Sequence, residues 1–135
     1  MRTETFQTTR QLALSVKLPR GDIDVETSDT DETVVVLDGS SDRAERQIER
    51  ADVRLEDRGD HDELIIDVDP DDISWSAGRL KLAINFDLRK DSIDVRVRVP
   101  HGTILRAATG SADIRARGRF RELETKTGSG DIAVD

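Results

Sequence analysis

The chain has 135 residues, a formal net charge of −8 at pH 7 and no cysteine. This length fits one domain with one hydrophobic core. The acidic balance opposes binding to nucleic acid or to an anionic lipid surface, because both need a basic face. Without cysteine the chain has no disulfide, no thiolate metal site and no thiol redox motif.

The sequence contains no apolar segment of the kind that targets or anchors a protein. Residues Met1 to Gln11 are polar and lack the apolar stretch of a signal peptide, and no window is apolar enough for a membrane-spanning helix. We therefore expect no membrane insertion and a cytoplasmic location for the sequence as written. Association with the cell envelope would follow if the sequence were part of a longer chain.

Apolar residues alternate with polar residues along much of the chain. The alternation is long in residues 12–18, 80–88 and 93–99, and shorter in residues 23–27, 34–37, 53–55 and 64–68. A period of two indicates strands with one buried and one solvated face. The three prolines, Pro19, Pro70 and Pro100, lie where such runs stop. We expect an all-β domain of about ten short strands in a rolled, solenoid-like arrangement.

One stretch, residues 42–52, has the periodicity of a helix. Ala44, Ile48 and Ala51 would share one face of it. Asp42, followed by Glu45 three residues later, predicts an N-terminal cap at Asp42. We expect this single short helix to pack on the edge or the end of the sheet.

Residues 103–117 and 121–135 form an internal repeat with an offset of 18 residues. Each unit holds two short strands joined by Thr-Gly-Ser-(Ala/Gly)-Asp-Ile. One unit cannot bury its apolar face alone, so the units must either stack as coils of a β-solenoid or repeat along a rolled sheet. The repeat matches Leu105 with Leu123, Thr109 with Thr127, Gly110 with Gly128, Ser111 with Ser129, Asp113 with Asp131, and Ile114 with Ile132.

The residues between the two strands of each unit are expected to have a structural role in the turn. Glycine supplies backbone freedom there, and an aspartate side chain can accept hydrogen bonds from the turn backbone. We assign this role to Gly110, Ser111, Asp113, Gly128, Ser129, Gly130 and Asp131.

These motifs give the chain a family resemblance. Strands that end in Pro-x-Gly, at residues 19–21 and 100–102, followed by Thr-Gly-Ser-Gly-Asp-Ile, resemble the bacterial β-strand-repeat family labelled putative adhesin and also called Toastrack. The resemblance covers most of residues 1–135 and is strongest from Ile93 to Asp135. It implies a single, non-enzymatic, β-solenoid-like scaffold, often found beside cell-envelope stress-response components. Members commonly continue with more repeats, so the stop at Asp135 directly after a strand indicates a domain truncated at its C-terminal end.

One acidic cluster invites comparison with a calcium-binding loop. It consists of Asp67, Asp69, Asp71 and Asp72. In an EF-hand register, however, Asp72 stands where glycine is required, and Gly78 stands where a bidentate glutamate is required. An irregular Ca²⁺ site and a solvated acidic turn are the two interpretations. The repeat aspartates also depart from the calcium-binding nonapeptide, because one residue is missing between the glycine and the aspartate.

The sequence shows no catalytic motif and no cofactor-binding motif. His61 and His101 are the only histidines, and both lie in predicted turns without a nucleophile, metal-binding or phosphate-binding motif nearby. The aromatic content of 3% also argues against glycan-stacking and single-stranded nucleic-acid surfaces. We expect neither enzymatic activity nor a cofactor.

The expected function is recognition. The last strand, formed by Asp131, Ile132, Ala133 and Val134, would leave backbone donors and acceptors unpaired. A strand from a protein partner or from a second copy of the chain could satisfy them by β-augmentation. The alternative is an acidic Ca²⁺-responsive binding module.

Overall fold

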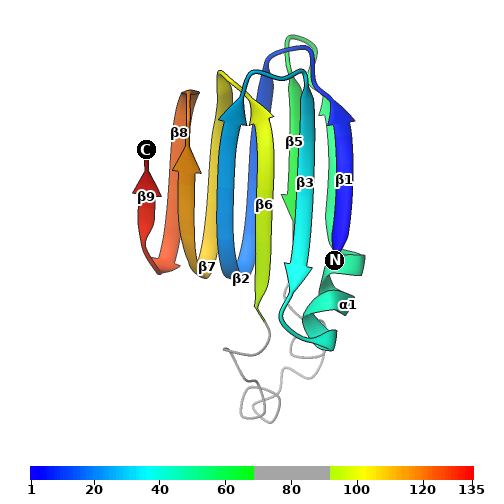
Figure 1. Cartoon of the computed structure of the whole chain (residues 1–135), viewed down its shortest axis with the longest axis vertical. Helices are drawn as coiled ribbons and strands as arrows, with labels where there is room; N and C mark the ends of the chain where they lie inside the picture. The colour runs from blue at the N-terminus through cyan, green and yellow to red at the C-terminus, as the bar shows by residue number, and fades with distance from the viewer. Residues whose placement is uncertain (69–91) are drawn as a thin grey trace.

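The computed structural model describes residues 1–68 and 92–135 (Figure 1). These residues form one short helix and a nine-stranded sheet, which confirms the all-β rolled fold predicted from the sequence. The elements are β1 (Arg2–Gln7), β2 (Leu12–Ser28), β3 (Glu32–Gly39), α1 (Asp42–Arg50), β4 (Asp52–Asp57), β5 (Asp62–Asp67), β6 (Ile93–Pro100), β7 (Thr103–Arg117), β8 (Phe120–Ser129) and β9 (Ile132–Val134).

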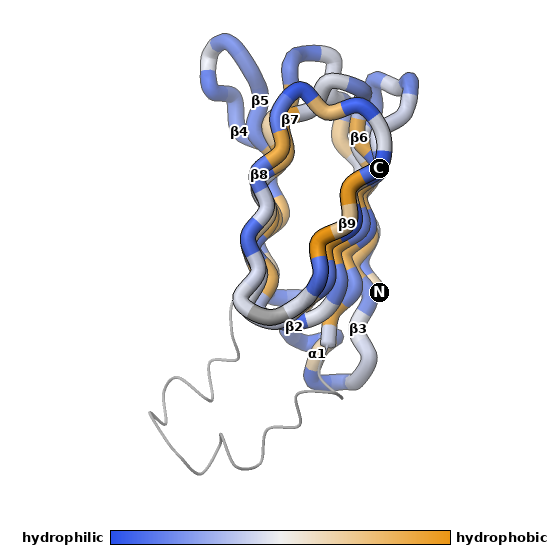
Figure 2. The backbone as a smooth tube through the Cα atoms, turned by 90° about the vertical axis from the view of Figure 1, so that its left-hand side faces the viewer, coloured by the Kyte–Doolittle hydropathy of each residue, from blue (hydrophilic) through white to orange (hydrophobic). Residues whose placement is uncertain are grey.

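Two long strands, β2 and β7, each contribute to both faces of a flattened tube (Figures 1 and 2). Residues 12–17 of β2 pair in parallel with β5, and residues 21–28 pair in parallel with β6. Strand β7 lies parallel to β2 along its length, and its two halves pair in parallel with β8 and β9. The successive coils of this β-solenoid are therefore β5 with β6, then β2, then β7, then β8 with β9.

The 18-residue repeat corresponds to two stacked coils. Leu105 pairs with Leu123, and Ile114 pairs with Ile132, in the parallel ladders that join β7 to β8 and β9. Strand β2 stacks on the other side of β7 in the same manner, because Ile23 pairs with Ile114. The chain thus contains a third equivalent coil, which the sequence comparison did not find.

The inward side chains of these coils form one continuous core. Their alternation with outward polar residues places one aliphatic layer on the next along the tube. Each of the core positions Leu14, Val16, Ile23, Val25, Val95, Leu105 and Ile114 exposes no more than 1% of its surface.

Helix α1 begins at Asp42, as the predicted range 42–52 has it, but its N-cap lies one residue earlier than predicted. Its N-cap is Ser41, whose hydroxyl oxygen accepts a hydrogen bond from the amide of Ala44 at 3.1 Å. Asp42 instead lies in the first turn, where its negative charge favours the positive end of the helix dipole. Glu45 accepts from the amide of Gly39 at 3.0 Å, not from the cap residue. The predicted cap at Asp42 was therefore wrong, and the helix ends at Arg50 instead of Asp52.

Antiparallel strands and the helix close one end of the tube. Strand β4 pairs antiparallel with β5, and β1 and β3 extend the other face in antiparallel order. Arg2 donates to the carbonyl oxygens of Ile48 and Ala51 at 3.0 and 2.8 Å, and so ties β1 to the C-terminal end of α1. The coil of β8 and β9 forms the opposite end (Figure 2).

The prolines are placed differently from one another. Pro100 ends β6, as predicted. Pro19 lies inside β2, between the segments that pair with β5 and β6, and does not end the strand. Proline is tolerated there because a strand that changes faces does not need every N–H for its ladder. Pro70 and the predicted run 80–88 lie outside the described residues.

Candidate functional site

The last coil, formed by β8 and β9 and called here the open coil, presents core-type positions to solvent. Among the described strands, β8 and β9 pair only with β7. Ile132 and Val134 are 42% and 56% exposed, although the residues stacked beneath them, Ile114 and Ala116, are buried. Figure 2 looks along the tube and shows the hydrophobic residues of β9, in orange, at this end. The open coil therefore exposes the next layer of the core.

Strand β8 frames the other side of this exposed layer. Leu123 faces inward and is half-buried against the core. Thr127 donates a hydrogen bond from its hydroxyl to the carbonyl oxygen of Ala112 at 3.1 Å. The outward-facing residues of β8, Glu122, Glu124 and Lys126, are exposed and include both negative and positive charges. The inner side of β8 thus carries one leucine and two threonines, Leu123, Thr125 and Thr127, and its outer side is charged.

Aspartates at the corner of each coil hold the next coil. The amide of Asp113 donates to Asp22 Oδ1 at 3.4 Å, and the amide of Asp131 donates to Asp113 Oδ1 at 2.8 Å. Each of these hydrogen bonds therefore joins a backbone amide at the corner of one coil to the aspartate side chain of the preceding coil. Asp131 is exposed at the place where a further coil would stack.

The corner glycines are required by the close stacking of the coils. A Cβ atom on Gly128 would lie 2.7 Å from the carbonyl oxygen of Gly110, and one on Gly110 would lie 2.9 Å from that of Pro19. Gly130 has a positive φ, and a Cβ there would collide with the carbonyl oxygen of Ala112. Ser111 pairs with Ser129 in the same ladder.

A row of aspartates crosses the outer face of the sheet next to this corner. Burial, followed by the charges of Asp22 and Asp38, raises the pKa of Asp94, and Arg96 opposes the shift. Within residues 1–68 and 92–135, no cluster of three or more potential ligands is arranged to hold a metal ion. The strand registers place Asp38, Asp94, Asp22 and Asp113 in this row, and the hydrogen bond from the amide of Asp131 to Asp113 adds Asp131.

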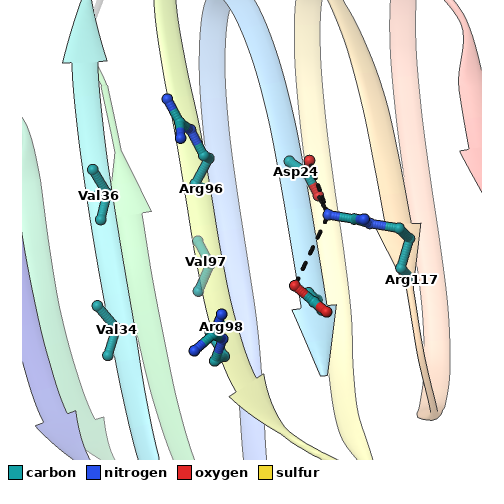
Figure 3. A pocket seen from close by; sticks show the side chains of 8 residues that line it. Asp24, Val34, Val36, Arg96, Val97, Arg98 and Arg117 are labelled. Carbon is teal, nitrogen blue, oxygen red and sulfur yellow. Dashed lines mark hydrogen bonds and ion pairs between the residues drawn. The ribbon is translucent and has the colours of Figure 1, made fainter. Parts of the chain in front are cut away.

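Beside this row lies a pocket of about 300 Å³ on the outer face of β3, β6, β2 and β7 (Figure 3). Arg117 donates to the two carboxylate oxygens of Asp24 at 3.2 and 3.4 Å and lies 3.9 Å from Glu26. Arg96 and Arg98 project from β6 on the other side of these carboxylates. The sequence showed the alternating arginines of β6, but not the neighbours that the fold brings to them.

The two histidines lie in turns. The ring nitrogen Nδ1 of His61 lies 2.6 Å from Asp60. His101 Nδ1 lies 2.9 Å from the hydroxyl of Thr27, which also accepts from the amide of Arg119 at 2.7 Å. Thr27 is buried, so this contact ties the turn after β6 to the turn after β7.

The remaining predicted metal ligands cannot be placed as a group. Asp67 is half-buried at the end of β5, and Asp69, Asp71 and Asp72 lie outside the described residues.

In the described part of the chain, no helix has the length and apolar character needed to cross a bilayer.

The comparisons with known proteins identify the fold. No family model and no curated protein matches the sequence. A putative cell adhesion protein from Clostridium sporogenes has a similar structure, with a TM-score of 0.65, 12% identity and coverage of 96% of this chain. A putative lipid binding protein from Parabacteroides distasonis has a TM-score of 0.48, 15% identity and coverage of 93% of this chain. A putative adhesin from Parabacteroides merdae has a TM-score of 0.38, 10% identity and coverage of 98% of this chain. This chain covers 58%, 45% and 55% of those three chains, respectively. It shares its β-solenoid fold with the clostridial protein.

Proposed function

We propose that this domain is a non-enzymatic recognition scaffold whose open coil binds a second copy of the chain. The observation that carries the proposal is the exposure of Ile132 and Val134 at positions that the preceding coils bury. Apolar side chains next to an unpaired strand edge favour the addition of another strand. The resemblance to the putative-adhesin and Toastrack family, and the fold shared with a putative cell adhesion protein, support a scaffold in a cell-envelope setting.

The charges on β8 favour pairing with an identical strand. In an antiparallel pair related by a two-fold axis at Thr125, Glu124 lies opposite Lys126 of the second copy, and the symmetry creates this pair twice. Leu123 then faces Thr127 of the second copy, on the inner side of both strands. In this arrangement the exposed core layer of one copy packs on that of the second copy, and the charged outer sides of the two β8 strands also pair.

Other registers of the same pair are less favourable. An axis at Glu124 would set that glutamate against its own copy, and like charges directly opposite each other destabilise a strand pair. A slip by one residue would turn Leu123 towards solvent in one of the copies. The axis at Thr125 avoids both costs.

Sedimentation equilibrium of the 135-residue chain tests the proposal. We expect the wild type to form dimers, Val134→Lys to be monomeric, and Ala133→Lys to dimerise like the wild type. Residues 133 and 134 are neighbours on β9, but Ala133 pairs with outward-facing Arg115 and Val134 with buried Ala116. The two variants therefore add the same charge on opposite faces. A wild type that stays monomeric at millimolar concentration contradicts the proposal.

The charge pairs on β8 provide an independent arm of this experiment. Glu124→Lys alone should weaken the dimer, because it sets two lysines against each other in each pair. The double variant Glu124→Lys with Lys126→Glu should restore the dimer, because both pairs are reversed. Equal weakening by the single and the double variant would exclude this register.

A further inference from the structure

We infer that Arg96 and Arg98 form a second binding site, which takes a short extended acidic peptide with two carboxylates spaced two residues apart. Both arginines project from the outer face of β6 and line the pocket of about 300 Å³ described above. Figure 3 shows them between Val34 and Val36 of β3 and the pair of Arg117 with Asp24. The site lies on the outer face of the sheet and not at the exposed edge of the open coil.

Neither guanidinium group is paired with a carboxylate of the described residues, and the charge of Arg96 only counteracts part of the rise in the pKa of Asp94. Their cross-strand neighbours on β2 are Asp24 and Glu26, which the register places beside Arg96 and Arg98. Arg117 approaches both of these carboxylates from the opposite side, at 3.2 Å from Asp24 and 3.9 Å from Glu26. The side chains of Arg96 and Arg98 form no hydrogen bond or ion pair with the described residues, and both residues are exposed.

The geometry of β6 matches a ligand in the extended conformation. Alternate residues of a strand lie about 6.6 Å apart, so an extended peptide with acidic residues at positions i and i+2 has the same spacing as the two arginines. Arginine binds a carboxylate through two parallel N–H groups, which gives direction as well as charge. The half-buried side chains of Val34 and Val36 offer aliphatic contact beside the charges.

The neighbouring aspartates limit the ligand to a short acidic segment. Asp94 lies two residues before Arg96 on the same face and belongs to the row that also contains Asp22 and Asp38. A long polyanion that followed β6 would run over this row and be repelled. A short peptide whose two carboxylates bind Arg96 and Arg98, and whose other residues are apolar, avoids repulsion by this row of aspartates. The observations therefore favour an acidic peptide over a nucleic acid or a sulfated polysaccharide.

Fluorescence anisotropy with a labelled peptide, Val-Glu-Val-Glu-Val, tests this inference on the full chain. We expect saturable binding that weakens as salt is added, and no binding of the matched peptide Val-Gln-Val-Gln-Val. Arg96→Gln and Arg98→Gln should each reduce the affinity about tenfold. Arg115→Gln removes the same charge from an exposed position on β7 that does not line the pocket, and should leave the affinity unchanged.

Each other outcome contradicts the inference. Failure of the peptide to bind the wild type at millimolar concentration would exclude the site. An equal loss in Arg98→Gln and Arg115→Gln would show attraction by general charge only. Displacement of the peptide by inorganic phosphate at equal concentration would indicate a simple anion site, and tighter binding of heparin than of the peptide would indicate a polyanion site. Circular dichroism of each variant shows whether the fold is retained.

Discussion

The amide of Asp131 donates a hydrogen bond to the carboxylate of Asp113, one coil earlier, at 2.8 Å. Asp113 in turn donates its own amide to Asp22 of the preceding coil at 3.4 Å. The aspartate of the repeat thus links one coil to the next at the corner, where the close approach of the backbones leaves little room for other side chains. This contact gives the aspartate of the repeat a structural role at the corner.

Loss of this contact should loosen the open coil. In Asp113→Ala the amide of Asp131 loses its acceptor, and we expect its hydrogen exchange to accelerate about fivefold. In Asp113→Asn the side-chain oxygen can still accept, so exchange should stay close to that of the wild type. Exchange measured by NMR distinguishes the two variants. The same rate in both would show that the contact does not hold β9.

The corner glycines should differ in their tolerance of a side chain. A Cβ on Gly21 would collide with the backbone of Ile93, whereas one on Gly102 would meet no atom within 4 Å, and both residues have a positive φ. We expect Gly21→Ala to lower the free energy of unfolding by about 3 kcal/mol or more, and Gly102→Ala by about 1 kcal/mol. Urea denaturation measures both values. Equal losses would contradict the stacking of β2 on β6.

Equivalent leucines of the repeat should contribute unequally to stability. Leu105 is buried between two coils, whereas Leu123 is half-buried in the open coil. We expect Leu105→Ala to lower the free energy of unfolding by about 3 kcal/mol and Leu123→Ala by about 1 kcal/mol. The measurement is urea denaturation at a protein concentration below that at which dimers form. Losses of the same size would mean that the last coil is covered in the monomer.

The raised pKa of Asp94 predicts a dependence of stability on pH. Burial and the charges of Asp22 and Asp38 disfavour the ionised carboxyl in the folded chain. Its contribution to folding is therefore most favourable below its ordinary pKa of 3.8, and is lost as the pH rises through the raised value. Asp94→Asn should be more stable than the wild type at pH 7, and this advantage should disappear below the ordinary pKa. Thermal unfolding at several pH values measures it, and a variant less stable at pH 7 would contradict the prediction.

The sequence predicted the solenoid because the signals for it, a short repeat and an alternation of apolar and charged residues, lie in neighbouring residues. Leu105 and Leu123 lie in matching units, and the alternation of apolar and charged residues determines which side of each strand is buried. The third coil shares Gly21, Asp22 and Ile23 with Gly130, Asp131 and Ile132 of the last unit. It was missed because Asp22 lies 91 residues before Asp113, its partner in β7, whereas the repeat has an offset of 18 residues. Strands far apart in the sequence can therefore form neighbouring coils.

The binding surfaces depended on contacts that the sequence does not record. The arginines of β6 are visible in the sequence as alternating charges. Whether they are paired depends on Arg117, because this residue of β7 reaches the neighbouring carboxylate of Asp24 from the other side of β2. The cap of α1 was misplaced because Ser41 and Asp42 are both good capping residues, and the backbone decides between them. Periodicity therefore predicted the strands, while the tertiary fold determined which polar groups are paired.

Covalent trapping tests the proposed docking of two open coils most directly. The chain has no cysteine, so a single one can report the register. In the pair centred on Thr125, two copies of Thr125→Cys face each other across the strands, whereas two copies of Glu124→Cys lie on a diagonal, too far apart for good disulfide geometry. Under mild oxidation we expect a covalent dimer of Thr125→Cys and little of Glu124→Cys. A Thr125→Cys chain that remains monomeric, or a Glu124→Cys chain that links as readily, would contradict the account.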